Sequence, residues 1–229
     1  MTPRATLIFA AGFGTRMGAL TATRPKPLIE VAGKALIDHA LALTDGVARV
    51  VVNTHYEADQ MAAHLANRNV TISHEPEILD TGGGLKAALP LLTPPGQPGA
   101  VFTLNSDAVW AGPNPLSLLR AAWRPGMAAL LLLVPPGQVR GRLGGGDAAL
   151  GPEGQLIWGG EMVYSGAQIV ETAPLARIPD AAFGMRRLWA SAAGAIFGLP
   201  YPGLWCDVGH PAGIAAAEAM LAEAGGILP

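Results

Sequence analysis

The chain has 229 residues, enough to bury a substantial core without disulfides, and its single cysteine excludes an intramolecular disulfide. Of these residues 50% are apolar and 14% charged, and the formal net charge of −2 provides no basic field for nucleic acid. The longest apolar run, Met127–Val134, is far shorter than the ~20 residues that span a bilayer. We therefore expect a cytoplasmic protein that binds neither nucleic acid nor a membrane.

The first part of the chain alternates short apolar runs with amphipathic segments. Five aliphatic or β-branched runs that end at Gly, Pro, Asn or Asp are predicted strands: 6–10, 50–52, 70–72, 101–104 and 130–134. The predicted helices between them are 36–43, 58–67, 85–92 and 116–123. This alternation indicates βαβ units, and hence an α/β fold with a largely parallel sheet covered by helices.

The second part of the chain is less regular. The predicted elements are an irregular glycine-rich loop at 141–146, a hairpin at 148–158, strands at 167–170 and 194–199, and a terminal helix at 211–224. The hairpin is expected to turn at Pro152-Glu153-Gly154. Since no long linker separates the two parts, we expect a single domain over 1–229.

The strongest local signal follows the first predicted strand. Gly12 and Gly14 lie where that strand ends, which is the edge where open α/β sheets bind ligands. Glycines let backbone N–H groups come close to a phosphate chain, and Arg16 adds a planar cation suited to phosphate oxygens. Alone this loop is a weak indication, because a tight turn followed by a surface arginine has the same sequence.

Two better-known phosphate motifs fit poorly. The P-loop pattern G-x-x-x-x-G-K-[ST] is missing, and the dinucleotide pattern G-x-G-x-x-G fails at its last position, Met17. A dinucleotide-dependent oxidoreductase also needs an acidic ribose ligand near the end of the second strand, where this chain has Asn53. The pattern therefore disfavours an oxidoreductase.

A second element is Lys26, which stands between Pro25 and Pro27. Each proline fixes its own φ and restricts the residue before it, so we expect a stiff, extended backbone here. A stiff mount would position an ammonium group for a transferring phosphoryl group; the alternative is a surface turn with a solvated lysine. The closeness of the glycine–arginine loop favours the functional interpretation.

Together these segments resemble the sugar-1-phosphate nucleotidyltransferase family, whose pattern is L-A-A-G-x-G-x-R-M, then L-T, then P-K-P-L. The chain reads FAAGFGTRM at 9–17, LT at 20–21 and PKPL at 25–28. The resemblance is strongest to short bacterial members that act on N-acetylmuramate 1-phosphate or mannose 1-phosphate. It implies a Rossmann-like, GT-A-like fold with a mixed, mainly parallel sheet. The nucleotide-binding half would be about 1–135 and the sugar-phosphate-binding half about 136–229.

The resemblance also implies roles for individual residues. Arg16 would contact the β- and γ-phosphates, Lys26 would stabilise charge at the α-phosphate, and the catalytic Asp107 would bind Mg²⁺ together with Asp207. The implied nucleotide-binding residues are Ala11, Gly12, Gly14, Thr15, Asn53, Asp80, Gly82 and Gly83. The implied sugar-phosphate-binding residues are Asn105, Gly146, Asp147 and Glu161.

Several of these assignments have structural alternatives. Taken alone, Asp107 and Asp207 are more typical of turns and helix caps than of a metal site, and Asn53 is as typical of a strand end as of a nucleotide contact. The glycines at 82–84 also fit the start of a helix. Ser106 and His210 stand where the family has glycine and threonine, and residues 144–148 depart from its sugar-binding pattern.

The implied reaction transfers NMP from a nucleoside triphosphate to a sugar 1-phosphate and releases pyrophosphate. The preferred donor is UTP and the cofactor is Mg²⁺, as a step in cell-wall or other nucleotide-sugar supply. Because the attacking phosphate is already an anion, positioning and electrostatic stabilisation should carry the catalysis. The alternatives are GTP with mannose 1-phosphate, a non-sugar acceptor such as phosphocholine, and a non-catalytic nucleotide sensor. A monomer or homodimer is expected.

Overall fold

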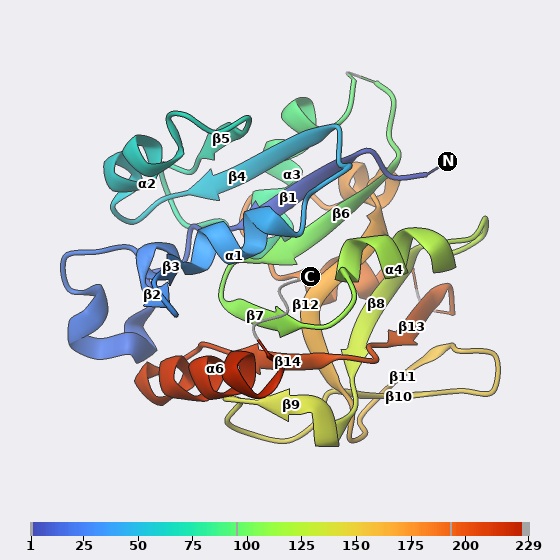
Figure 1. The fold of residues 1–229 in the computed structure, drawn as a ribbon. Helices are drawn as coiled ribbons and strands as arrows, with labels where there is room; N and C mark the ends of the chain where they lie inside the picture. Colours follow the sequence, from blue (N-terminus) through green and yellow to red (C-terminus); the bar gives the residue numbers. More distant parts are fainter. Residues whose placement is uncertain (1, 95, 193, 226–229) are drawn as a thin grey trace.

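The computed structural model describes residues 2–94, 96–192 and 194–225. Its centre is a seven-stranded sheet in the order β13-β8-β12-β6-β1-β4-β5 (Figure 1). In that order the strands are Ile196–Pro200, Ala129–Val134, Val163–Glu171, Ala100–Asn105, Ala5–Phe9, Arg49–Thr54 and Thr71–His74. All are parallel except β12, which is antiparallel to both neighbours. The mixed, mainly parallel α/β sheet predicted from the sequence is confirmed.

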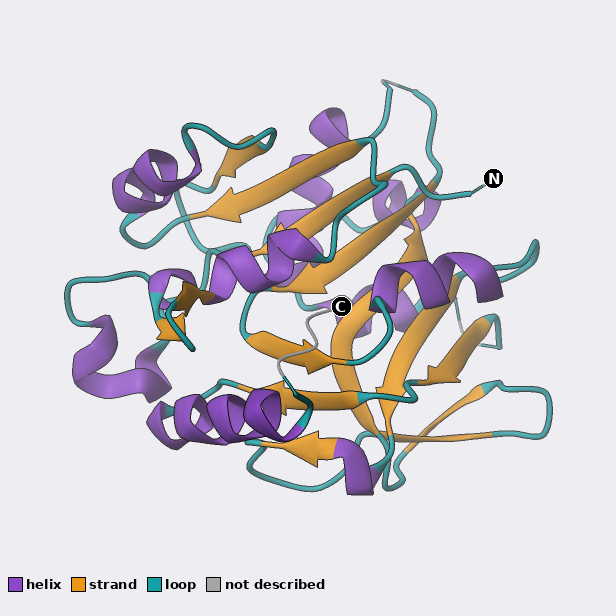
Figure 2. Ribbon diagram, viewed as in Figure 1, coloured by secondary structure: helices purple, strands orange, loops and turns teal. Residues whose placement is uncertain are grey.

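Helices cover both faces of this sheet (Figure 2), which is why its inner strands are continuously apolar. In β1, Ile8 packs into the core on one face and Leu7 into the core on the other. The first core includes side chains of α1 (Leu36–Ala42), α2 (Ala58–Leu65) and α4 (Pro115–Ala122). The second includes side chains of α3 (Asp80–Leu92) and α5 (Met185–Ala190).

A second, three-stranded sheet was not predicted from the sequence. It pairs β7 (Ala108–Ala111), β14 (Leu204–Asp207) and β9 (Val139–Arg140) in the order β7-β14-β9. The C-terminal helix α6 (Pro211–Glu223) packs against it through Ala217, Met220 and Leu221, and confirms the predicted terminal helix. Strands of two to four residues are too short to show a clear period, and β14, which pairs with β7, comes from far along the chain.

The predicted hairpin is confirmed as β10 (Ala148–Leu150) paired antiparallel with β11 (Leu156–Trp158). A further two-stranded hairpin joins β2 (Glu30–Val31) and β3 (Lys34–Ala35). Short 3-10 turns lie at Thr15–Thr21, Lys26–Leu28, Pro136–Gln138 and Ala173–Arg177. Among the described residues, no helix is long and apolar enough to cross a membrane.

One helix begins earlier than predicted. We expected a helix at 85–92, whereas α3 begins at Asp80 and includes three glycines, which are poor helix formers. A Cβ on Gly82 would lie 2.4 Å from the Phe183 ring, and a Cβ on Gly83 would lie 2.2 Å from the carbonyl oxygen of Ala181. Close packing therefore requires glycine here and outweighs helix propensity.

Candidate active site

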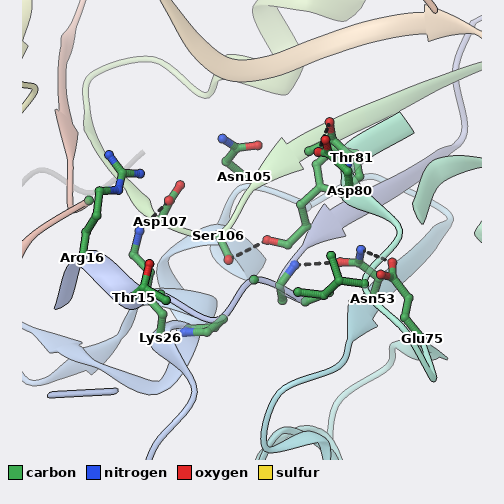
Figure 3. Close-up of a pocket in the computed structure, with 18 residues that line it drawn as sticks. Thr15, Arg16, Lys26, Asn53, Glu75, Asp80, Thr81, Asn105, Ser106 and Asp107 are labelled. Carbon is green, nitrogen blue, oxygen red and sulfur yellow. Dashed lines mark hydrogen bonds and ion pairs between the residues drawn. The ribbon is translucent and has the colours of Figure 1, made fainter. Parts of the chain in front are cut away.

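A cleft of about 470 Å³ opens where β1, β4 and β6 end at the same edge of the sheet (Figure 3). Its lining residues are Phe9, Ala10, Ala11, Gly12, Gly14, Thr15, Arg16, Lys26, Pro27, Asn53, Glu75, Ile78, Asp80, Thr81, Asn105, Ser106, Asp107 and Gly209. The cleft brings together most of the residues that the sequence singled out. Arg16, Lys26 and Asp107 lie at one end, called the charged end below, while Asn53 and Glu75 lie at the other (Figure 3).

The two glycines of the loop after β1 have different roles. Gly14 has a φ of 66°, and a Cβ there would lie 2.8 Å from the Cβ of Lys26, so the fold itself requires glycine. A Cβ on Gly12 would meet nothing within 4 Å, and its φ lies outside the left-handed region. The packing of the protein therefore does not demand glycine at position 12, and the free space beside it belongs to the cleft.

Lys26 is held by a turn and not by the extended backbone that we expected. The N–H of Leu28 donates to the carbonyl of Pro25, and the N–H of Ile29 donates to the carbonyl of Lys26, which closes a 3-10 turn. The Lys26 ammonium is buried and lies 2.6 Å from Oδ2 of Asp107. The backbone that carries Lys26 is still rigid, because the turn directly follows Pro25.

The second sheet brings Asp207 beside Asp107. Strands β7 and β14 pair antiparallel with Asp207 opposite Ala108, and the N–H of Val208 donates to the carbonyl oxygen of Asp107 at 2.9 Å. The Asp207 carboxylate lies against Gly209, which lines the cleft. Two aspartates that are distant in the sequence therefore lie close together, with Asp107 in the described lining of the cleft and Asp207 beside it, against Gly209.

The charges at this end of the cleft act on the pKa of Asp207. Burial raises the pKa of Asp207 and the neighbouring carboxylate of Asp107 raises it further, while Lys26, Arg16 and Arg142 oppose that shift. Two adjacent carboxylates suit a hard cation such as Mg²⁺, which commonly uses one or two carboxylates plus phosphate oxygens. In the described part of the chain, no three His, Cys, Asp or Glu side chains are placed so that together they could hold a metal ion. The donor set therefore fits a cation shared with a bound phosphate, and not a closed protein cage.

The opposite end of the cleft contains Glu75, which sequence reasoning missed. The N–H of Ala10 donates to Oδ1 of Asn53 at 2.7 Å, and Nδ2 of Asn53 donates to Oε1 of Glu75 at 2.7 Å. The second oxygen, Oε2 of Glu75, accepts from the N–H of Leu79 at 3.1 Å. The pair thus connects the start of the glycine loop to the start of α3 (Figure 3). An acidic residue just after the predicted strand 70–72 was the available signal.

We expect Asn53→Ala to destabilise the protein. The change leaves the buried N–H of Ala10 and one carboxylate oxygen of Glu75 without their partners, at a cost of about 1–3 kcal/mol for each buried group. The free energy of unfolding from urea titration should fall by about 2–4 kcal/mol. The exposed Asn67→Ala is the control, and should change it by less than about 0.5 kcal/mol. Equal stabilities for the two variants would contradict this assignment.

The segment 80–83 divides between the cleft and the interior. Asp80 and Thr81 line the cleft, and Oδ1 of Asp80 accepts from the N–H of Thr81 at 2.6 Å. The N–H groups of Gly82 and Gly83 both donate to the carbonyl of Phe183, at 2.9 and 3.0 Å. The free structure therefore uses Gly82 and Gly83 in packing α3, and presents Asp80 and Thr81 to the cleft.

A second cleft of about 310 Å³ adjoins the first and shares Phe9, Thr81 and Asn105 with it. Its other lining residues are Asp147, Trp158, Tyr164, Gly184, Met185, Arg186 and Trp189. Asn105 and Asp147, two of the predicted sugar-phosphate residues, line this space. Gly146 packs against the backbone of Glu161, and neither lies among the described lining residues of the two clefts.

Two of the departures from the family pattern, Ser106 and His210, have structural roles. The hydroxyl of Ser106 donates to the carbonyl of Phe9 at 2.6 Å, which ties the end of β6 to the end of β1. Nε2 of His210 lies 2.7 Å from the carbonyl oxygen of Gly141, so that its ring connects the glycine-rich loop to the Asp207 segment. Ser106 therefore supports the position of Asp107, which follows it, and His210 supports the position of Asp207, which precedes it.

The fold and the site define a nucleotidyltransferase, and comparison with known proteins agrees. The family model described as MobA-like NTP transferase domain matches residues 6–225. The chain belongs to this family, and within it to the sugar-1-phosphate nucleotidyltransferases that its sequence pattern resembles. It is an enzyme of that type.

Its similarity to one relative extends over almost the whole chain. It is 41% identical to the N-acetylmuramate alpha-1-phosphate uridylyltransferase of Caulobacter vibrioides, over 97% of this chain and 98% of the relative. A mannose-1-phosphate guanyltransferase of Hypocrea jecorina is 40% identical over 45% of this chain and 30% of the relative. In fold the chain matches HddC from Yersinia pseudotuberculosis complexed with GMP-PN, with a TM-score of 0.75 at 19% identity, over 96% of this chain and 99% of that chain.

Proposed function

We propose that the enzyme transfers UMP from UTP to a sugar 1-phosphate in the cytoplasm, with Mg²⁺ as its metal, and releases pyrophosphate. The observation that carries this proposal is that one cleft is lined by the glycine loop, Arg16, Lys26 and Asp107, with the Asp207 carboxylate beside it against Gly209. The uridylyl preference follows the Caulobacter vibrioides relative, which is similar over its full length.

The triphosphate is assigned to the glycine loop and the charged end. The open space beside Gly12 gives a phosphate chain room to approach the backbone, and Arg16 supplies a permanent cation for its outer phosphates. The buried Lys26 ammonium stabilises negative charge at the α-phosphate. Asp107 and Asp207 would hold Mg²⁺. The ion would neutralise the phosphate charge that Arg16 and Lys26 leave unbalanced.

The acceptor enters from the second cleft, because that cleft joins the first at Asn105, two residues before Asp107. An oxygen of the acceptor phosphate attacks the α-phosphorus, and the bond to the pyrophosphate oxygen breaks. No general base is required, since the attacking oxygen is already an anion. The residues therefore act by holding two mutually repelling anions in line and by neutralising charge in the transition state.

We expect Gly12→Ala to weaken UTP binding without damaging the fold. A methyl group at this position projects into the space assigned to the phosphates, so the KM for UTP should rise roughly tenfold, in the range of an overpacked site. The melting temperature should match that of the wild type. Gly14→Ala is the comparison, because its positive φ and its contact with Lys26 should lower the melting temperature itself. A normal KM for UTP in Gly12→Ala would remove the glycine from the nucleotide site.

The decisive experiment is a matrix of UTP, GTP, CTP, dTTP and ATP against a panel of phosphorylated acceptors with Mg²⁺, scored by pyrophosphate release. The panel includes N-acetylmuramate, mannose and glucose 1-phosphates, together with phosphocholine. Release that depends on UTP and on a sugar 1-phosphate supports the proposal. Preference for GTP and mannose 1-phosphate, or for phosphocholine, would replace it. Nucleotide binding with no release from any combination would indicate a sensor.

A further inference from the structure

The chain between the glycine loop and Lys26 has little regular structure of its own. One 3-10 helix, Thr15–Thr21, is interrupted at Gly18, whose φ of 58° and ψ of −127° are not helical. Residues 22–25 follow it and belong to no helix or strand. We call residues 15–25 the linking segment, because they join the glycine loop to Lys26. A segment of this kind must be held in place by contacts from other elements.

Two side chains at the start of α2 bind three consecutive carbonyl groups of the linking segment. The hydroxyl of Tyr56 lies 2.9 Å from the carbonyl oxygen of Thr21 and 3.0 Å from that of Ala22, and donates its hydrogen between them. Nε2 of Gln60 donates to the carbonyl of Thr23 at 2.8 Å. Since β4 is parallel to β1, the chain enters α2 at the edge of the sheet where the glycine loop lies (Figure 1).

The ring of Tyr56 makes a separate contact with the glycine loop. Phe13, which stands between the two glycines, has its ring centroid 5.8 Å from that of Tyr56 and 5.3 Å from that of His55. His55 is itself fixed, because its Nδ1 lies 2.8 Å from the carbonyl oxygen of Glu75. Tyr56 therefore contacts the chain at two places, through its ring before the linking segment and through its hydroxyl within that segment.

Thr21 connects these contacts to Lys26. Its buried hydroxyl donates to the carbonyl of Gly14 at 3.0 Å, with the carbonyl of Gly18 at 3.2 Å. A Cβ on Gly14 would lie 3.1 Å from Cγ2 of Thr21 and 2.8 Å from Cβ of Lys26, so both side chains pack against this glycine. A shift of Thr21 would therefore be passed to the side chain of Lys26.

We propose that Tyr56 is a positioning residue for nucleotidyl transfer, which fixes the linking segment so that the Lys26 ammonium meets the α-phosphate. Tyr56 lies outside the described lining of the cleft, whereas Lys26 lines it, so the tyrosine acts through the lysine and not on the substrate. Catalysis by a fixed charge depends steeply on its position, which is why a hydroxyl that never touches the substrate affects turnover. This inference rests on the proposed function.

The test is Tyr56→Phe, which keeps the ring contact with Phe13 and removes only the hydroxyl. At saturating UTP and acceptor, kcat should fall roughly tenfold, because Lys26 is no longer held at the α-phosphate. Hydrogen–deuterium exchange of the linking segment in the free enzyme should become roughly tenfold faster. Tyr201→Phe is the matched control and should change neither, since the Tyr201 hydroxyl donates to the carbonyl of Pro113 at 3.0 Å, outside the described lining of the cleft.

A double-mutant cycle separates positioning from a general structural role. In the Lys26→Ala background, Tyr56→Phe should lower kcat by less than about twofold, because the group that it positions is already gone. Gln60→Ala, which frees the carbonyl of Thr23, should lower kcat roughly threefold in the wild type and have no further effect in Lys26→Ala.

The outcomes separate this inference from the proposed function. A similar loss of kcat on Tyr56→Phe in both backgrounds would overturn the role of Tyr56 and leave nucleotidyl transfer intact. So would a folded Tyr56→Phe enzyme that keeps the wild-type kcat or the wild-type exchange of the linking segment. Failure of the wild type to release pyrophosphate with any nucleotide and any acceptor would instead overturn the proposed function.

Discussion

Lys26→Ala should lower kcat by at least ~10²-fold, the loss typical of a transition-state electrostatic contact. The ammonium is buried against Asp107 at 2.6 Å, in the part of the cleft where the α-phosphate is assigned. Removing the ammonium takes away the cation that would stabilise the transferred phosphoryl group. It also leaves the negative charges of Asp107 and Asp207 close together without a neighbouring lysine. The effect should therefore fall mainly on kcat and less on the KM for UTP. The measurement is steady-state pyrophosphate release with saturating Mg²⁺.

Lys34→Ala is the matched control for this change, because Lys34 lies in the β2–β3 hairpin outside the described lining of the cleft. It should leave kcat unchanged. Melting temperatures of both variants identify any general loss of folding. A folded Lys26→Ala enzyme with near wild-type turnover would exclude Lys26 from the chemistry.

Asp107→Ala should likewise lower kcat by at least ~10²-fold. Asp107 is the point at which the lysine, the second aspartate and the end of β6 meet, through its ion pair with Lys26 and its backbone contact with Val208. The milder Asp107→Asn keeps the shape but removes the charge, so the Mg²⁺ concentration needed for half-maximal rate should rise as well. Pyrophosphate release measured across a Mg²⁺ titration distinguishes the two effects.

The exposed Asp45→Asn serves as the control for loss of a carboxylate, and should leave both the rate and the Mg²⁺ requirement unchanged. If Asp107→Asn showed the wild-type rate at the wild-type Mg²⁺ concentration, Asp107 would be a structural partner of Lys26 and not a metal ligand. The same titration on Asp207→Asn tests the second carboxylate independently.

Much of this molecule could be predicted because its signals are local. The inner strands are buried on both faces, so runs such as 130–134 are apolar without interruption and are recognised from sequence alone. The glycine loop follows β1 directly, and its residues reach the cleft through local geometry alone. Arg16 and Lys26 were predicted as site residues for the same reason, since both follow that loop closely in the sequence.

Tertiary structure decided how the distant parts combine. Nothing local to Leu204–Asp207 indicates that it pairs with Ala108–Ala111, yet that register alone places Asp207 beside Asp107. The glycines at 82 and 83 read as a ligand-binding loop, and only their packing against Phe183 and Ala181 shows that the fold itself needs them. The buried Asn53–Glu75 pair is likewise invisible without knowing which groups each of the two side chains contacts.

The sequence by itself therefore determined the α/β class, the position of the glycine loop after β1 and the charged residues near it, because these follow from periodicity and from short contiguous motifs. The convergence of the two aspartates, the antiparallel insertion of β12 and the aromatic second cleft were decided only in three dimensions. The physical reason is that pairing between short, distant strands is selected by the summed packing of the whole chain, which no single segment encodes.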